Sequence, residues 1–126
     1  MDKIIIKEDG KVIEARNAML NNSYFNDVAM TNVTIINANL SDLEIDGAQI
    51  GGSYIHNIGG PPVDHPMYDP NFKHRPVCFE NCDLNNSAFK NCDLSGVSIT
   101  ESNLSGMRIN GINVEELLKT YNDKSK

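Results

Sequence analysis

A bulky apolar side chain recurs at every fifth position in two long tracts of the chain. A helix repeats about every 3.6 residues and a strand every second residue, so neither element alone produces this spacing. A fixed short repeat predicts a solenoid, in which each repeat packs only against its neighbours. The bulky residues are Leu20, Phe25, Met30, Ile35, Leu40, Ile45, Ile50, Ile55 and then Phe79, Leu84, Phe89, Leu94, Ile99, Leu104, Ile109.

A turn-forming residue, here called the corner residue, follows each bulky residue by two positions. Fourteen of the fifteen corner residues are Asn, Asp or Gly, types that accept a positive φ, and Glu101 is the exception. Two positions before each bulky residue lies a small or apolar one, so each repeat predicts one large and one small inward side chain. The corner residues are Asn22, Asp27, Asn32, Asn37, Asp42, Gly47, Gly52, Asn57 and then Asn81, Asn86, Asn91, Gly96, Glu101, Gly106, Gly111.

Three of the five-residue repeats share a common pattern: Ala-Asn-Leu-Ser-Asp at 38–42, Cys-Asp-Leu-Asn-Asn at 82–86 and Cys-Asp-Leu-Ser-Gly at 92–96. These motifs resemble the pentapeptide-repeat family, whose members fold as right-handed quadrilateral β-helices. The resemblance implies an all-β fold in which four corners close one coil. Fifteen repeats then predict about four coils, stacked at the spacing of about 4.8 Å between neighbouring strands.

Both ends of the chain predict capping elements. Residues 3–15 favour a β-hairpin that turns at 8–10 and covers the first coil, because Asp-Gly between apolar runs is a hairpin signal. Residues 114–121 favour a helix with Asn113 as its N-cap. This helix either covers the last coil or joins two copies of the chain through one apolar face, formed by Val114, Leu117, Leu118 and Tyr121.

The segment 59–76 interrupts the repeat. It holds all five prolines of the chain, and 24 residues separate Ile55 from Phe79, which is not a multiple of five. Proline cannot donate to a strand ladder, so we expect a protruding loop. The loop is either an ordered interaction element or an insertion without a partner. Its candidate contact residues are His65, Met67, Tyr68, Phe72, His74 and Arg75.

We therefore expect one pentapeptide-repeat domain over residues 1–126. Its parts are the hairpin cap 1–17, the first tract 18–58, the loop 59–76, the second tract 77–113, and the helix and tail 114–126.

The net charge of −6 is concentrated in the two tracts, which contain eight acidic residues and only two basic ones, Lys90 and Arg108. This sign argues against direct nucleic-acid binding. We define an acidic face by Asp42, Glu44 and Asp46. The resemblance implies one alternative function, because some pentapeptide-repeat proteins imitate duplex DNA and bind DNA gyrase, protecting it from quinolones. A chain this short would need to dimerise to imitate the length of DNA.

No catalytic constellation or phosphate-binding glycine loop is present in the sequence, so we expect no enzyme and no cofactor. Three cysteines give no disulfide framework, and Cys82 and Cys92 occupy inward positions as small apolar fillers. A metal site at His65 and His74 is a weaker alternative to no metal at all. No apolar run reaches the length of a membrane span, and the first one is too short for a secretory signal.

The sequence thus predicts a cytoplasmic, non-enzymatic structural or protein-interaction module. It binds an unidentified protein, contacts no membrane, and is either a monomer or a helix-mediated homodimer.

Overall fold

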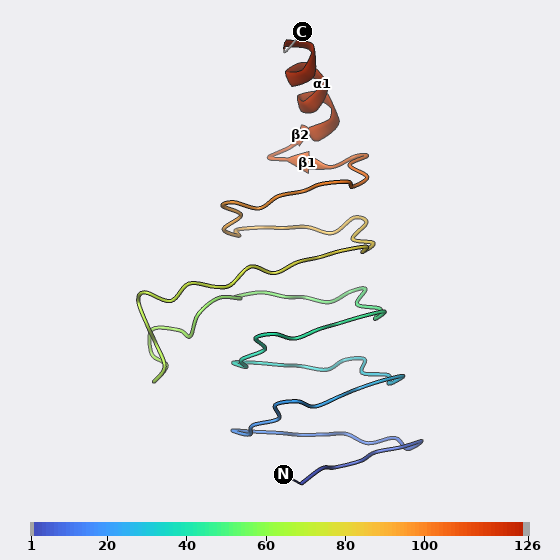
Figure 1. Cartoon of the computed structure of the whole chain (residues 1–126), viewed down its shortest axis with the longest axis vertical. Helices are drawn as coiled ribbons and strands as arrows, with labels where there is room; N and C mark the ends of the chain where they lie inside the picture. Colours follow the sequence, from blue (N-terminus) through green and yellow to red (C-terminus); the bar gives the residue numbers. More distant parts are fainter. Residues whose placement is uncertain (1, 125–126) are drawn as a thin grey trace. The chain divides into compact units, whose positions relative to one another are not determined.

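The computed structural model describes residues 2–124 (Figure 1). The chain divides into two compact units, Met1–Pro76 and Val77–Lys126. The division falls at the predicted junction between the loop and the second tract. The organisation as a single domain stays a prediction.

The predicted corners are confirmed in both units. All fifteen corner residues have a positive φ, between +49° and +80°. Even Glu101, the one residue of unfavourable type, adopts a φ of +49°. Because the chain turns a corner at every fifth residue, each unit winds back and forth in short extended pieces (Figure 1).

Two kinds of corner alternate along the chain. At one kind, the carbonyl of the bulky residue accepts a hydrogen bond from the backbone N–H three positions later, as in Ser53 N to Ile50 O at 3.0 Å and Val97 N to Leu94 O at 3.1 Å. A positive φ on the third residue of such a turn is the signature of a type II β-turn. The corners in between, such as 47 and 91, are bends. The structural repeat is therefore ten residues, twice the period of the sequence.

An Asp or Asn side chain supports several of the hydrogen-bonded corners. The Oδ1 atoms of Asp83, Asp93 and Asn103 each accept a bond of 3.0 Å from the backbone N–H two positions later. Such Asx turns stabilise the bend locally. Hydrogen bonds from the hydroxyl and the N–H of Ser95 hold the pKa of Asp93 below its usual value. The acidic residue before the bulky Leu thus has a structural role at the corner.

The predicted four-coil β-helix is not seen among residues 2–124. Within the first tract the bulky side chains remain between 43% (Ile50) and 68% (Ile55) exposed. The only sheet among residues 2–124 has two strands and lies outside this tract. The reason is that the backbone hydrogen bonds of the repeats close corners between residues three apart, and none seen in the described chain joins one coil to the next.

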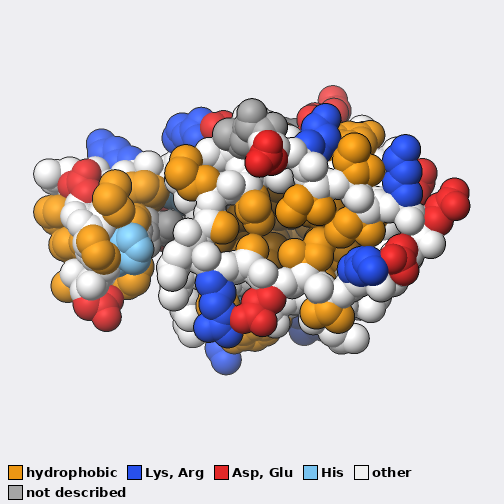
Figure 2. Space-filling view, turned by 90° about the horizontal axis from the view of Figure 1, so that it is seen from below, with side chains coloured by type: hydrophobic (Ala, Val, Ile, Leu, Met, Phe, Trp, Pro, Cys, Tyr) orange, Lys and Arg blue, Asp and Glu red, His pale blue; other side chains and the backbone are white. Residues whose placement is uncertain are grey.

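The side chains are nevertheless sorted by type around the winding chain. Seen from the N-terminal end, hydrophobic side chains gather in the middle of the face and charged ones lie at its rim (Figure 2). Tyr24 and Tyr54, which directly precede a bulky residue, are more exposed than any bulky residue of their tract. The inward and outward positions therefore follow the predicted pattern, although the interior is open.

The C-terminal end of the second tract forms a true β-hairpin. Strand β1 (Arg108–Ile109) pairs antiparallel with β2 (Ile112–Asn113), and Ile109 lies opposite Ile112. Asn110 and Gly111 connect them with φ values of +49° and +79°. Two consecutive positive φ values define a type I′ turn, whose twist matches that of the strands. The sequence prediction treated Gly111 as an ordinary corner and missed this Asn-Gly signal.

The predicted C-terminal helix is confirmed and is longer than expected. Helix α1 spans Val114–Lys124. Asn113 Oδ1 accepts a bond of 3.1 Å from the N–H of Glu116, which confirms the N-cap. The N–H of Val114 also bonds to Met107 O at 3.0 Å. Val114 is 8% exposed and is the one buried hydrophobic side chain of the described residues.

The predicted N-terminal hairpin is wrong for the described residues, because no strands pair between positions 2 and 17. The chain bends near Asp9, which forms an ion pair of 2.8 Å with Lys11. A positive φ of +51° falls on Glu8, whereas Gly10 does not adopt one. Without a two-residue turn of matching twist, the flanking apolar runs do not pair and Ile4 stays exposed.

The two neighbouring glycines of one corner provide a test of the turn type. Gly52 has a φ of +80°, while Gly51 has none in the left-handed region, and an added Cβ meets no atom within 4 Å at either position. We predict that Gly52→Ala lowers the free energy of unfolding by about 1 kcal/mol because alanine is strained at this φ. Gly51→Ala leaves it unchanged or raises it by up to about 1 kcal/mol. Urea unfolding of both variants checks this, and equal effects would contradict the type II turn.

Candidate interaction surface

The proline-rich loop consists of consecutive β-turns. Backbone N–H groups of His65, Tyr68 and Phe72 each donate to the carbonyl three positions earlier, at 2.9, 3.0 and 3.1 Å. Pro66 and Pro70 occupy the second position of the last two turns, where the φ fixed by the proline ring fits. The prolines that prevent strand formation therefore give the loop a defined turn structure.

Two side chains bond to the backbone inside these turns. Asp69 Oδ1 accepts a bond of 2.9 Å from the N–H of Asn71. His65 Nδ1 accepts a bond of 3.0 Å from the N–H of Met67, which places the proton of the neutral ring on Nε2. Predicted as a contact residue, His65 is half-buried and supports its own turn.

The aromatic ring of Phe72 lies against the backbone at the start of the loop. A Cβ added to Gly60 would come within 2.5 Å of Phe72 Cδ1, so only glycine leaves room for the ring at this position. This contact brings the two ends of the turn-containing segment together.

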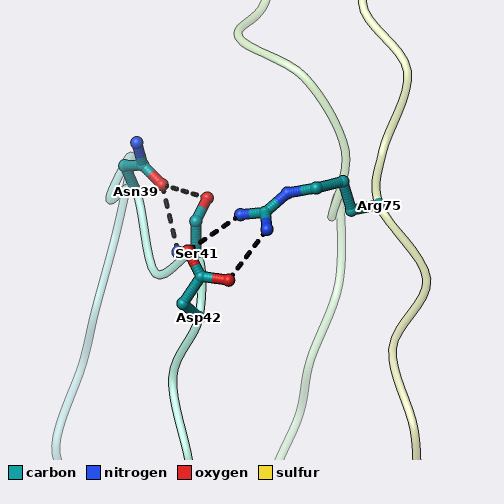
Figure 3. Close-up of polar contacts among 4 residues, drawn as sticks. All are labelled: Asn39, Ser41, Asp42 and Arg75. Atoms are coloured by element: carbon teal, nitrogen blue, oxygen red, sulfur yellow. Dashed lines mark hydrogen bonds and ion pairs between the residues drawn. The ribbon is translucent and has the colours of Figure 1, made fainter.

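An ion pair connects the end of the loop to the first tract (Figure 3). Arg75 Nη1 donates to Asp42 Oδ1 at 2.8 Å, and Nη2 donates to Oδ2 at 3.0 Å. The two residues are 33 positions apart in the sequence. Their side chains are 66% and 76% exposed. This two-bond geometry fixes the guanidinium relative to the carboxylate more closely than a single bond would.

The same corner is held from within its own repeat. Asn39 Oδ1 accepts bonds from the N–H and the hydroxyl of Ser41, at 3.1 and 2.6 Å (Figure 3). The hydrogen bonds and charge of Arg75 hold the pKa of Asp42 below its ordinary value of 3.8. In turn Asp42 raises the pKa of Arg75 above its ordinary range. Both groups are therefore charged at neutral pH.

The structure thus brings together two residues that the sequence placed in separate groups. Asp42 belonged to the predicted acidic face and Arg75 to the predicted contact loop. No local sequence signal connects positions so far apart, and the pairing follows from the path of the loop. Glu44 and Asp46 remain exposed without a salt bridge among the described residues.

The remaining predicted contact residues of the loop are exposed. Met67 is 72% exposed, and Tyr68 and Phe72 also leave a large part of their side chains in solvent. His74 is exposed as well. The loop therefore presents apolar side chains on a backbone held by turns.

The residues of the predicted apolar face of the C-terminal helix differ in burial. Val114 is buried at the start of α1, next to the hairpin, as a cap would require. Leu117, Leu118 and Tyr121 are exposed. An open groove on this side is lined by Ile112, Glu116, Leu117, Thr120, Tyr121 and Lys124. The homodimer stays a prediction.

The cysteines do not fill a core. All three are exposed, and the thiols of Cys82 and Cys92 donate to the carbonyls of Glu80 and Lys90, each at 3.3 Å.

Among residues 2–124, no three His, Cys, Asp or Glu side chains lie close enough together to hold a metal ion. No helix in the described part of the chain is long and apolar enough to cross a membrane.

Comparison with protein-family models decides the nature of the repeat. Residues 78–115 match the model for pentapeptide repeats in eight copies. The chain carries pentapeptide repeats. The predicted resemblance is therefore confirmed for the second tract, up to the start of α1. The pentapeptide corners of the first tract, which lies outside the match, have the same positive φ values as those inside it.

No curated protein and no solved structure matches the chain in the corresponding comparisons.

The Asp42–Arg75 pair can be tested by removing the carboxylate charge. We predict that Asp42→Asn increases the motion of residues 73–75 because Arg75 loses its partner. Heteronuclear NOE measurements on backbone amides should show lower values there. Asp46→Asn removes the same charge from the same tract and should leave these values unchanged. A loop equally ordered in both variants would contradict a holding role.

The pair also predicts a dependence on pH. The pKa of Asp42 is lowered in the folded chain, so the stabilisation is fully present above the ordinary value of 3.8 and is lost as the pH falls through the lowered pKa. Arg75 stays protonated over this range because the pKa of an arginine lies far above it, and Asp42 raises that pKa further. The same amides should therefore become mobile only below about pH 4, and in Asp42→Asn their mobility should show no such step.

Proposed function

We propose that the chain is a non-enzymatic protein-interaction module whose contact element is the loop at 59–76. Pentapeptide repeats support such a role in general. The observation that carries the proposal is the ion pair of Arg75 with Asp42, which fastens the loop to the tract while Met67 remains 72% exposed.

A fastened loop suits binding for an energetic reason. Association costs conformational entropy when a flexible segment has to be ordered, and a segment already held by turns has less to lose. The turns ending at Tyr68 and Phe72 and the seat of the Phe72 ring at Gly60 supply this order. Exposed apolar side chains on such a frame are typical of contact surfaces.

The module can be tested with matched surface variants. Replacing Met67 and Tyr68 by serine removes apolar surface from the loop while its backbone turns stay possible. Replacing Met19 and Ile36 by serine removes comparable exposed apolar surface outside the loop. Each protein serves as bait in a cytoplasmic lysate of the source organism, where we expect the chain to reside, and bound proteins are quantified by mass spectrometry.

We expect at least one protein bound by the unchanged chain to fall about tenfold with the loop variant, the equivalent of about 1.4 kcal/mol. The control variant should retain it. Retention of every bound protein by both variants would contradict the proposal that the loop is the contact element.

We further propose that the repeats close into the right-handed quadrilateral β-helix implied by their family. The positive φ at every corner and the gathering of hydrophobic side chains in the middle of the face in Figure 2 support it. In the open coil, Leu40 and Leu94 are 49% and 51% exposed, and aspartate would be tolerated at both positions. In a closed coil, Leu40→Asp or Leu94→Asp places an unpaired charge in the interior and unfolds the chain.

Thermal unfolding followed by circular dichroism distinguishes these outcomes. Glu44→Lys, at an exposed position, is the control and should leave the unfolding temperature nearly unchanged. Equal unfolding temperatures for all three variants would exclude a closed interior.

The DNA-mimic alternative receives no specific support from the site. Arg75 compensates the charge of Asp42, so the predicted acidic face keeps only Glu44 and Asp46 as uncompensated carboxylates. Charge density is what a duplex imitation most requires. Binding to DNA gyrase therefore stays a prediction from the resemblance.

A further inference from the structure

Three consecutive residues that can carry positive charge end the loop: Lys73, His74 and Arg75. All three are exposed. Among the described residues, only Arg75 of the three forms an ion pair, and its partner is Asp42. The segment 73–75 is therefore rich in side chains that can carry positive charge, and the carboxylate of Asp42 already occupies the guanidinium of Arg75.

The occupied donor remains accessible. Both side chains of the pair are more than 60% exposed, at 66% and 76%. Exposed pairs of this kind are weak, because water solvates the separated charges well. An arriving carboxylate can therefore replace Asp42 on Arg75 and make the same two parallel hydrogen bonds.

We propose that Asp42 is an internal competitor for the docking site of a partner, and that Arg75 binds a carboxylate of that partner when Asp42 is displaced. This inference rests on the proposed function of the loop and identifies the chemistry of its partner. The partner is a protein segment that bears a carboxylate beside apolar side chains. The carboxylate meets Arg75, and the apolar groups meet the exposed Met67 and Tyr68.

A carboxylate fits this site better than the phosphates of a nucleic acid. The group that already occupies Arg75 is a carboxylate held by two bonds of 2.8 and 3.0 Å. The chain also carries a net charge of −6, which repels a polyanion more strongly than a segment with one or two acidic residues.

The test uses the full chain and a defined probe, the blocked peptide Leu-Glu-Glu-Leu, with Leu-Gln-Gln-Leu as its neutral counterpart. NMR titration follows the backbone amide signals of residues 73–75, which are present in every variant, and yields the dissociation constant. We expect Asp42→Asn to bind the acidic peptide about two- to tenfold more tightly, because the site is no longer occupied for part of the time. Arg75→Gln should abolish binding.

Asp46→Asn is the matched control. It removes one negative charge from the same tract but leaves Arg75 paired, so the affinity should not rise. An equal gain in both variants would show general electrostatic attraction and overturn the competitor role of Asp42. Equal binding of both peptides would also overturn it, as would binding of a short oligothymidylate in place of the acidic peptide.

The outcome is separable from that of the proposed function. The peptide titration reports on Arg75 in the purified chain, whereas the bait experiment reports on Met67 and Tyr68. Retention of every bound protein by the loop variant, together with tighter peptide binding by Asp42→Asn, would reject the proposed module and retain the exchangeable pair. A bound protein that the loop variant loses, together with no gain in peptide affinity for Asp42→Asn, would retain the module and reject Arg75 as its carboxylate site.

Discussion

The positive φ at every fifth residue is the constraint on which the rest of the structure depends. Each left-handed residue turns the chain after a short extended piece, and hydrophobic side chains gather in the middle of the face seen in Figure 2. Asn, Asp and Gly reach this region at little cost, which explains their place in the sequence. Glu101 adopts the same conformation, so the corners on either side impose the path even on a residue that does not favour it.

Local hydrogen bonds define the corners, whereas burial is confined to the C-terminal end. The type II turns and the Asx turns at Asp83 and Asp93 connect residues two or three apart. Packing requires residues from separate segments, and it is seen at Val114, where the hairpin β1–β2 meets the start of α1. The Asn-Gly turn makes this possible because it turns the chain back on itself instead of continuing the winding.

The loop at 59–76 combines local hydrogen bonds with contacts between segments that are distant in the sequence. Its turns are local and use Pro66 and Pro70, while its attachment depends on Gly60 and on the pairing of Arg75 with Asp42. The attachment orders a segment that carries exposed apolar side chains, and it occupies a cation that would otherwise be free. The ion pair therefore adds to the order that the turns and the Phe72 contact give the loop, and it also occupies Arg75.

The sequence by itself determined the features that depend on neighbouring residues. The period of five predicted every corner, and the helix with its cap at Asn113 was readable from residues 113–121, because φ preferences and capping act over a few positions. The hairpin at Asn110 and Gly111 was also readable but was masked by the repeat. Only the tertiary structure decided the open interior and the pairing of Asp42 with Arg75. Each of these depends on how far apart distant segments lie, and no local preference specifies that distance.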